Sequence, residues 1–198
     1  MHLGEVARDC GFKAGAFNLH TIIVAGEPGG SLPAVRELLK KLWPTARVYD
    51  HHGMTEVGPV SYECPKHPCR LHVIKDAFVA EVIDPKSLEP IGPGEQGELI
   101  LTTLDRIGSP LIRYRTGDLV EPMPSGMCEC GSSDLALAGG IIGRRDDMVV
   151  VRGVNIYPSA VDQIVRECGG ISEYRVDVKK VRNLAELEVT IEPDANVS

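Results

Sequence analysis

Residues 50–56, Asp-His-His-Gly-Met-Thr-Glu, bring together in one short stretch groups that bind phosphate, metal and flat rings. Glu56 offers a hard oxygen ligand of the kind that Mg²⁺ prefers when it also holds phosphates, and Thr55 offers a hydroxyl. His52 has a flat ring that can stack on a base, and Gly53 lets the backbone approach a ligand closely. A polar surface turn can have the same composition, so this DHHGMTE turn needs support from other stretches.

Two further stretches carry groups that suit a nucleotide. Asp118, in the sequence Tyr-Arg-Thr-Gly-Asp-Leu at residues 114–119, can accept two hydrogen bonds from a ribose diol. An Asp that only stabilises its own Thr-Gly-Asp turn is common, however, and by itself that interpretation is the better one. Residues 143–147, Gly-Arg-Arg-Asp-Asp, suit either a hinge or a plain linker.

The elements around the DHHGMTE turn predict a parallel β-sheet. Residues 21–25 (TIIVA) form the continuous apolar, β-branched run that is typical of a strand buried on both faces. Ser31 is expected to cap a helix that begins near Pro33, and residues 46–52 form the next strand. Such a strand–helix–strand order is a βαβ unit with parallel strands. The loop at residues 26–30 and the DHHGMTE turn should therefore face one crevice at the same sheet edge.

The pattern changes from about residue 70 onward. Short β-type runs separated by Pro/Gly turns predict an antiparallel sheet or a small barrel. A hairpin at residues 148–157, a helix opened by Pro158 and two alternating strands then predict a third unit. One helix cannot cover such a sheet well, so we expect this unit to be incomplete at residue 198. Cys168 falls on the apolar face of the helix and is expected to be a small core residue.

Composition narrows the class of protein. The 198 residues are 43% hydrophobic with a net charge of −7, and no run of Lys and Arg offsets this charge, so we expect a globular protein that does not bind nucleic acid. No stretch approaches the roughly 20 apolar residues of a membrane span. The N-terminal segment lacks a signal-peptide core, so the expected location is the cytoplasm, without a membrane partner.

Two of the six cysteines, Cys64 and Cys69, lie near His67 and His72, and the β-rich region that follows could bring Cys128 and Cys130 to them. In a cytoplasmic chain they are metal ligands or free thiols rather than disulfides. Four Cys/His ligands would make a closed structural zinc site, but the spacing is looser than that of a zinc finger. On spacing alone, zinc and a set of reduced thiols are equally good interpretations. The candidates are Cys64, His67, Cys69, His72, Cys128 and Cys130.

The order and separation of three stretches, at residues 50–56, 114–118 and 143–165, resemble those of the adenylate-forming ligases. The forms AGEPGG at residues 25–30 and NIYPSAV at residues 155–161 resemble the phenylacetate–coenzyme A ligase branch. The resemblance covers nearly the whole chain. It implies an ATP-dependent acid–thiol ligase that joins an aryl carboxylic acid to coenzyme A through an acyl-adenylate. The implied cofactors are ATP or AMP, Mg²⁺, coenzyme A and a structural Zn²⁺.

The resemblance also implies a mixed α/β and α+β fold. Residues 1–142 would be the C-terminal part of the large adenylate-forming domain. Within it, residues 1–63 would be the βαβ portion and residues 64–142 a β-rich subdomain with the probable zinc site. Residues 143–198 would be the hinge and an incomplete C-terminal lid domain.

The roles of family residues can be placed on matching positions of the chain. Thr55 would contact the α-phosphate and Glu56 would bind Mg²⁺. Asp118 would bind the ribose hydroxyls, with support for ribose or phosphate from Arg144. The adenine and acyl pocket would be bordered by Gly26, Glu27, Pro28, Asp50, His51, His52, Gly53 and Met54. The family usually has Tyr where this chain has His52, which leaves the stacking role of that position in question.

The remaining implied roles concern the lid and the zinc site. Asp146 would be the hinge about which the lid turns, and Gly153 would lie in the loop that meets the pantetheine arm of coenzyme A. The implied zinc ligands are Cys64, His72, Cys128 and Cys130. His67 and Cys69 fall outside this pattern and are the expected substitutes.

Two catalytic elements of the family are not found in this sequence. The Ser/Thr/Gly-rich phosphate loop would lie upstream of residue 1, and neither Lys179 nor Lys180 has the context of the catalytic Lys near the end of the lid. We therefore expect a partial enzyme that is inactive alone and needs an upstream half, which a separate gene could encode; a homodimer is compatible with this. The alternatives are a non-catalytic zinc-stapled nucleotide-binding or assembly module, or a truncated reading of a longer gene. Phenylacetate is the acid that the resemblance implies by default, and the sequence leaves benzoate-like, anthranilate-like and other aryl acids open.

Overall fold

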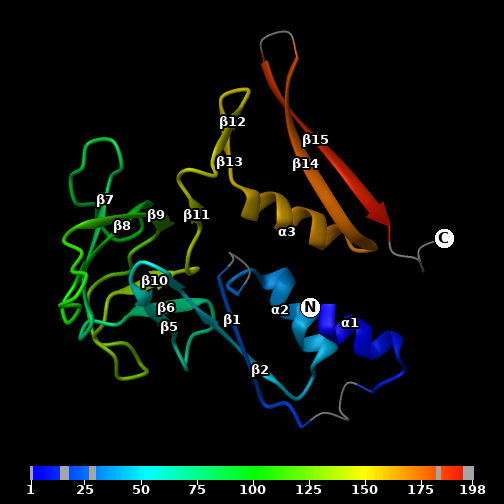
Figure 1. Ribbon diagram of the computed structural model, residues 1–198, viewed down its shortest axis with the longest axis horizontal. Helices are drawn as coiled ribbons and strands as arrows, with labels where there is room; N and C mark the ends of the chain where they lie inside the picture. Colours follow the sequence, from blue (N-terminus) through cyan, green and yellow to red (C-terminus); the bar gives the residue numbers. More distant parts are fainter. Residues whose placement is uncertain (1, 14–17, 27–29, 182–183, 194–198) are drawn as a thin grey trace. The chain divides into compact units, whose positions relative to one another are not determined.

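The computed structural model describes residues 2–13, 18–26, 30–181 and 184–193 (Figure 1). The chain divides into two compact units, Met1–Arg145 and Asp146–Ser198. This boundary follows Arg145, whereas the sequence analysis places it after residue 142. No helix among the described residues combines the length and the apolar composition that crossing a bilayer requires.

The first unit begins with a parallel βαβ arrangement. Its elements are α1 (His2–Asp9), β1 (Thr21–Ala25), α2 (Pro33–Leu42) and β2 (Arg47–His51). Strands β1 and β2 pair in parallel with Ala25 opposite His51, which confirms the predicted unit. The chain segments that follow both strands therefore leave from the same edge of the sheet. The core between helix and strands is formed by Val35, Leu39, Leu42, Trp43 and Val48.

Two local expectations for this region are wrong. Helix α2 has Leu32 at its N-cap, and Ser31 instead donates a hydrogen bond from Oγ to Oδ2 of Asp50 (2.5 Å). Strand β1 is not buried on both faces, because Ile22 and Val24 pack against the α2 core while Ile23 is 68% exposed. Among the described residues, β1 pairs only with β2.

The rest of the first unit is an antiparallel β-structure around a second core. Its short strands are β3 (Gly53–Met54), β4 (Gly58–Pro59), β5 (Ser61–Glu63), β6 (Arg70–Val73), β7 (Phe78–Ile83), β8 (Gly97–Thr103), β9 (Tyr114–Val120), β10 (Ala136–Ala138) and β11 (Gly143–Arg144). They form sheets in the orders β10-β6-β5 and β11-β9-β8-β7, with β3 and β4 as a separate pair. The predicted antiparallel sheet is confirmed, whereas the described strands do not close into a barrel. The most deeply buried core side chains include Val60, Leu71, Leu99, Leu101, Val120 and Leu137.

Strand β9 runs straight through the Thr-Gly-Asp sequence that was expected to form a turn. Gly117 adopts a φ of 78°, and the pairing with β8 shifts register between Glu98 and Ile100. An irregularity of this kind re-aims a side chain while the strand continues. Asp118 consequently lies inside the sheet structure with only 4% of its surface exposed.

In the part of the second unit that the structure describes, there are one helix and two antiparallel strand pairs. Its elements are β12 (Val149–Val151), β13 (Val154–Ile156), α3 (Pro158–Cys168), β14 (Ile171–Val181) and β15 (Leu184–Pro193). The turn between β12 and β13 has positive φ at Arg152 (49°) and Gly153 (85°), as a two-residue hairpin loop requires. The predicted hairpin, helix and strand pair are confirmed.

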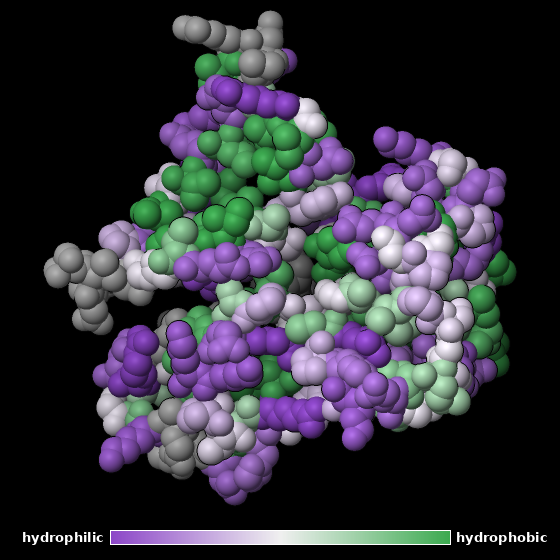
Figure 2. Space-filling view, turned by 180° about the vertical axis from the view of Figure 1, so that it is seen from behind, coloured by the Kyte–Doolittle hydropathy of each residue, from purple (hydrophilic) through white to green (hydrophobic). Residues whose placement is uncertain are grey.

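Helix α3 leaves much of the β14–β15 sheet uncovered. An open apolar groove of about 580 Å³ is lined by residues of both, among them Val161, Ile164, Leu187 and Val189. Figure 2 shows apolar side chains gathered on this part of the chain. Cys168 lines the groove and is exposed, so its predicted place in a closed core is wrong.

Candidate functional site

Four side chains of the β-rich region converge on one point. One ligand atom from each of Cys64, His72, Cys128 and Cys130 lies within 4.8 Å of all the others. The Sγ atoms of Cys64 and Cys128 are 3.7 Å apart, and Sγ of Cys130 is 3.5 Å from Nε2 of His72. Tetrahedral zinc, with bonds of about 2.3 Å to sulfur and about 2.0 Å to nitrogen, places such pairs roughly 3.8 Å and 3.5 Å apart. This Cys/His cluster therefore fits one tetrahedral ion.

Backbone pairing positions the cluster. Strands β5 and β6 align Tyr62 with His72, and the N–H of Cys64 donates to the carbonyl of Arg70 (2.8 Å). A tight turn holds the other two ligands, because the N–H of Gly131 donates to the carbonyl of Cys128 (2.8 Å). His72 and Cys64 are almost fully buried, at 0% and 1% exposure.

The electrostatics at Cys128 suit a metal ligand. The N–H of Cys130, together with other donors that include the Arg70 guanidinium 3.3 Å from Sγ, lowers the pKa of Cys128 to about 6. A thiolate is the form of cysteine that binds metal, so this ligand is largely deprotonated at neutral pH.

The two substitute ligands do not join the cluster. Cys69 lies near Arg36 and Glu63, and burial raises the pKa of its thiol. His67 Nε2 is 3.4 Å from a carboxylate oxygen of Glu129. The geometry thus gathers the four predicted ligands and leaves these two aside.

The DHHGMTE turn begins inside the protein and ends at its surface. Asp50 is 8% exposed, and burial raises its pKa although its carboxylate accepts hydrogen bonds from Ser31 Oγ and from the N–H of His51 (2.9 Å). A β-carbon at Gly30 would lie 2.1 Å from Oδ1 of Asp50, so this carboxylate has room only because residue 30 is glycine. Thr55 and Glu56 are exposed in the turn between β3 and β4.

Strand β9 brings the other two stretches to the DHHGMTE turn. Nε2 of His52 lies 3.0 Å from Oδ2 of Asp118, and Nη1 of Arg144 lies 3.3 Å from Oδ1. Strands β9 and β11 pair Asp118 with Arg144 directly. Residues that are far apart in the sequence thus meet around one buried carboxylate.

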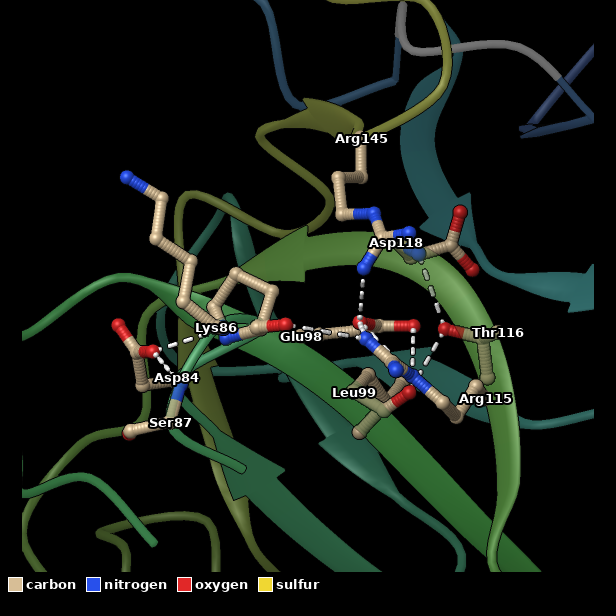
Figure 3. A network of polar contacts seen from close by, with 10 residues as sticks. Asp84, Lys86, Ser87, Glu98, Leu99, Arg115, Thr116, Asp118 and Arg145 are labelled. Atoms are coloured by element: carbon tan, nitrogen blue, oxygen red, sulfur yellow. Dashed lines mark hydrogen bonds and ion pairs between the residues drawn. The ribbon is translucent and has the colours of Figure 1, made fainter. Parts of the chain in front are cut away.

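A neighbouring carboxylate that the sequence analysis did not single out supports this arrangement. Glu98, which is 2% exposed on β8, binds Arg115 on β9 and lies 3.4 Å from Nη1 of Arg145 (Figure 3). Figure 3 also shows Asp118 nearby, with its N–H donating to Thr116 Oγ1 (3.0 Å). No sequence pattern indicates Glu98, because its partners depend on the register of three strands.

The remaining predicted residues lie elsewhere. Gly26 directly follows β1 and has a φ of 89°, while Glu27 and Pro28 lie outside the described residues. Asp146 is the first residue of the second unit, and Gly153 forms part of its β12–β13 turn.

The amino-acid sequence of this chain is similar to those of coenzyme A ligases and to one domain family. The family described as AMP-binding enzyme C-terminal domain matches residues 153–198. A phenylacetate-coenzyme A ligase of Thermus thermophilus is 38% identical over 144 residues, which are 71% of this chain and 32% of that protein. The corresponding ligase of Escherichia coli K12 is 32% identical over 191 residues, 95% of this chain and 42% of the relative. The chain belongs to the adenylate-forming ligase superfamily.

Solved structures of this superfamily share the fold. A crystal structure of 2-hydroxyisobutyryl-CoA ligase in complex with R3-HIB-AMP is 32% identical, with a TM-score of 0.89 over 98% of this chain and 41% of that chain. The predicted mixed α/β and α+β fold is thereby confirmed. The chain spans well under half the length of the curated relatives it matches.

The lowered pKa of Cys128 predicts its reactivity in the metal-free protein. Iodoacetamide alkylates thiolates but not thiols. In the presence of a chelator, the rate at which Cys128 is labelled should therefore increase with pH, with a midpoint at its pKa of about 6. Mass spectrometry of peptides labelled between pH 5 and 9 measures this midpoint. Arg70→Met removes one donor and should move the midpoint upward. A wild-type midpoint near the value of about 8.5 for a free cysteine would contradict the assignment.

Proposed function

We propose that this chain forms the nucleotide-binding part of an ATP-dependent aryl-acid–coenzyme A ligase of the phenylacetate–coenzyme A ligase type. The observation that carries this proposal is the contact of His52 and Arg144 with the buried carboxylate of Asp118. It unites the three sequence stretches in one place, and two relatives that are similar over most of this chain are phenylacetate-coenzyme A ligases.

The proposed reaction has two steps. A carboxylate attacks the α-phosphate of ATP and releases pyrophosphate, and the coenzyme A thiolate then displaces AMP from the acyl-adenylate. Both steps move charge on phosphate or acyl oxygens, so positioning and electrostatic stabilisation dominate catalysis. The protein must therefore hold base, ribose, phosphate and acid in fixed relative positions.

The described residues can hold the nucleotide in the following way. Asp118 accepts hydrogen bonds from the two ribose hydroxyls, and Arg144 stays beside it to support ribose or phosphate. His52 presents its ring to the adenine at the mouth of strand β2. Thr55 and Glu56 lie exposed at the turn, where the hydroxyl reaches the α-phosphate and the carboxylate would hold Mg²⁺, which neutralises phosphate charge when bound.

The Cys/His cluster is proposed as a structural zinc site of the same protein. Its four ligand atoms fit a closed tetrahedral shell, and a closed shell leaves no position for substrate. The zinc would join the segments at residues 64–72 and 128–130. A cytoplasmic location, where thiols stay reduced, suits these ligands.

An additional protein segment is proposed to complete the first unit. Parallel strands normally have both faces covered, yet Ile23 of β1 is 68% exposed. Leu3 and Phe12, before β1, are also 74% and 57% exposed. An upstream half that carries the phosphate loop, in the same or a separate chain, would cover these side chains. The second unit would serve as the lid, with Asp146 as hinge and Gly153 meeting coenzyme A.

The nucleotide assignment predicts the behaviour of an Asp118→Ala variant. Two charge-assisted hydrogen bonds, each worth roughly 1.5–3 kcal/mol, should make ATP or AMP bind at least about tenfold more weakly. The affinity for 2′,3′-dideoxy-ATP should change far less, because it lacks the hydroxyls. Isothermal titration of this chain, completed with the upstream portion of the Thermus thermophilus relative, measures both affinities.

A different result would reassign Asp118. Equal losses of affinity for the two nucleotides, together with a lower melting temperature, would show that Asp118 only stabilises its own strand. Glu98→Gln is the matched control, since it alters a neighbouring buried carboxylate that makes no proposed contact with ribose.

The metal assignment predicts about one zinc per chain in protein purified without chelator. Cys64→Ser should lose this zinc, whereas Cys69→Ser should retain it, because Cys69 lies outside the cluster. Elemental analysis of the purified variants measures the metal. If the wild-type protein holds no stoichiometric metal, the zinc proposal is wrong. If Cys69→Ser loses the zinc while Cys64→Ser keeps it, the ligand set is wrong.

A further inference from the structure

We propose that Glu63 is a positioning residue that couples the Cys/His cluster to the DHHGMTE turn. The inference rests on the zinc site proposed above. It adds that the metal does more than hold two segments of the chain together, because its ligands are linked through buried contacts to the backbone that presents His52.

The carboxylate of Glu63 receives hydrogen bonds from three separate parts of the first unit. It accepts one from the Arg36 guanidinium on α2 and one from the N–H of Asp50 on β2 (2.5 Å). It accepts a third from the N–H of Cys69 (3.3 Å), in the loop between two cluster ligands. Glu63 is 6% exposed and directly precedes the ligand Cys64. One buried anion therefore lies between the cluster and the end of strand β2.

The contacts on the cluster side constrain the loop geometry. Cys69 has a φ of 63°, a conformation that side-chain-bearing residues rarely adopt and that persists only where surroundings hold it. The N–H of Cys69 donates to the Glu63 carboxylate, and Cys69 lies in the sequence between the ligands Cys64 and His72. If either ligand moved, the N–H of Cys69 would move relative to the Glu63 carboxylate.

The contacts on the turn side run through strand β5. The N–H groups of Val60 and Ser61 both donate to the carbonyl of His52, at 2.9 and 3.0 Å. Nδ1 of His51 lies 2.6 Å from the carbonyl of Ser61. Together with the bond from Asp50 to Glu63, these contacts attach three consecutive residues of the turn to β5.

Charge makes Glu63 hard to replace. Arg36 is also buried, at 8% exposure, and its Nη1 lies 3.3 Å from the carbonyl of Val48. Removal of one partner from a buried pair leaves an uncompensated charge. Glu63→Gln keeps the shape and one acceptor oxygen. Its amide NH₂ faces either the N–H of Cys69, which donates to Oε1, or the N–H of Asp50 and the Arg36 guanidinium, which both donate to Oε2. The variant therefore tests the linkage with little change in volume.

A purely structural role for Glu63 makes a different prediction. In that case its loss would lower the stability of the whole unit, but the turn would not respond to the metal. Coupling requires that the turn responds to metal in the wild type and that this response disappears in the variant. Amide hydrogen exchange with and without zinc separates the two roles, since it reports local opening at each site.

The experiment follows exchange of the amides of Asp50, Val60 and Ser61 in this chain, loaded with zinc or stripped with a chelator. In the wild type, metal removal should accelerate these amides at least about fivefold, the lower end of typical coupling between sites. The core amides of β8 serve as internal reference and should change less than about twofold. In Glu63→Gln, zinc should remain bound, while the three amides exchange fast in both states.

Two further variants complete the design. Glu98→Gln alters another buried carboxylate paired with arginine, and it should keep the wild-type response to metal. Glu63→Asp keeps the charge beside Arg36 but has a shorter side chain, so it should fold and lose the response to metal. It replaces Glu63→Gln in the experiment if that variant does not fold.

Each contrary outcome has one meaning. A wild-type chain that binds zinc, but whose turn amides ignore its removal, would overturn the coupling and leave the zinc site in place. Equal acceleration of the β8 amides would mean global unfolding and would also overturn it. A full metal response in Glu63→Gln would show that Glu63 is not the link, and absence of any metal would remove the zinc proposal itself.

Discussion

A single buried carboxylate, that of Asp118, holds together the parts of the first unit on which its chemistry would depend. A buried carboxylate is stable only when donors surround it. Here those donors come from the end of β2 through His52 and from β11 through Arg144. Ribose hydroxyls can supply hydrogen bonds to the same oxygens, so the contacts that stabilise the unliganded fold also mark the place where a nucleotide would bind.

Around this point the fold replaces apolar packing with buried polar contacts. Asp50, Glu63 and Glu98 are each less than 10% exposed, and each is satisfied by arginine, hydroxyl or backbone donors. Such networks stabilise a unique arrangement when every member is satisfied, and they are costly when one partner is lost. These buried polar contacts hold the DHHGMTE turn and strand β9 in place in addition to the backbone pairing of the short strands. The Cys/His cluster is a further group of polar side chains in this unit, and it brings together side chains from residues 64–72 and 128–130.

Much of the local structure could be predicted from the sequence. The apolar run at residues 21–25 and the strand before the DHHGMTE turn predict the parallel pair, and Pro158 predicts the start of α3. The four clustered ligands were identified through the family resemblance, whereas their spacing alone did not separate zinc from free thiols. Local patterns contain this much information because strand and helix periods repeat over a few residues.

The errors arise where distant segments decide the outcome. Thr116 to Asp118 look like a turn, but Arg115 and Leu119 on either side of them pair with β8, and Asp118 pairs with β11, so the strand continues through them. Ser31 looks like a cap, but Leu32 lies at the N-cap, and the Ser31 hydroxyl donates to the buried Asp50 carboxylate, which is remote in sequence. Glu63 and Glu98 look like ordinary strand carboxylates, and only the register of neighbouring strands reveals their buried partners. Register is set by contacts between remote residues, which a local pattern does not contain.

We propose that this chain supplies one part of a composite site for making an acyl-adenylate. Pyrophosphate release with a panel of aryl acids tests it most directly, using the chain alone and then the chain completed with the upstream portion of the Thermus thermophilus relative. The account predicts no release by the chain alone, since loss of each charge-stabilising group costs on the order of 100-fold or more, and acid-dependent release by the completed protein. Robust release by the isolated chain would contradict the claim. Absence of release from a completed protein that binds AMP and zinc would contradict it equally and would favour a non-catalytic nucleotide-binding module.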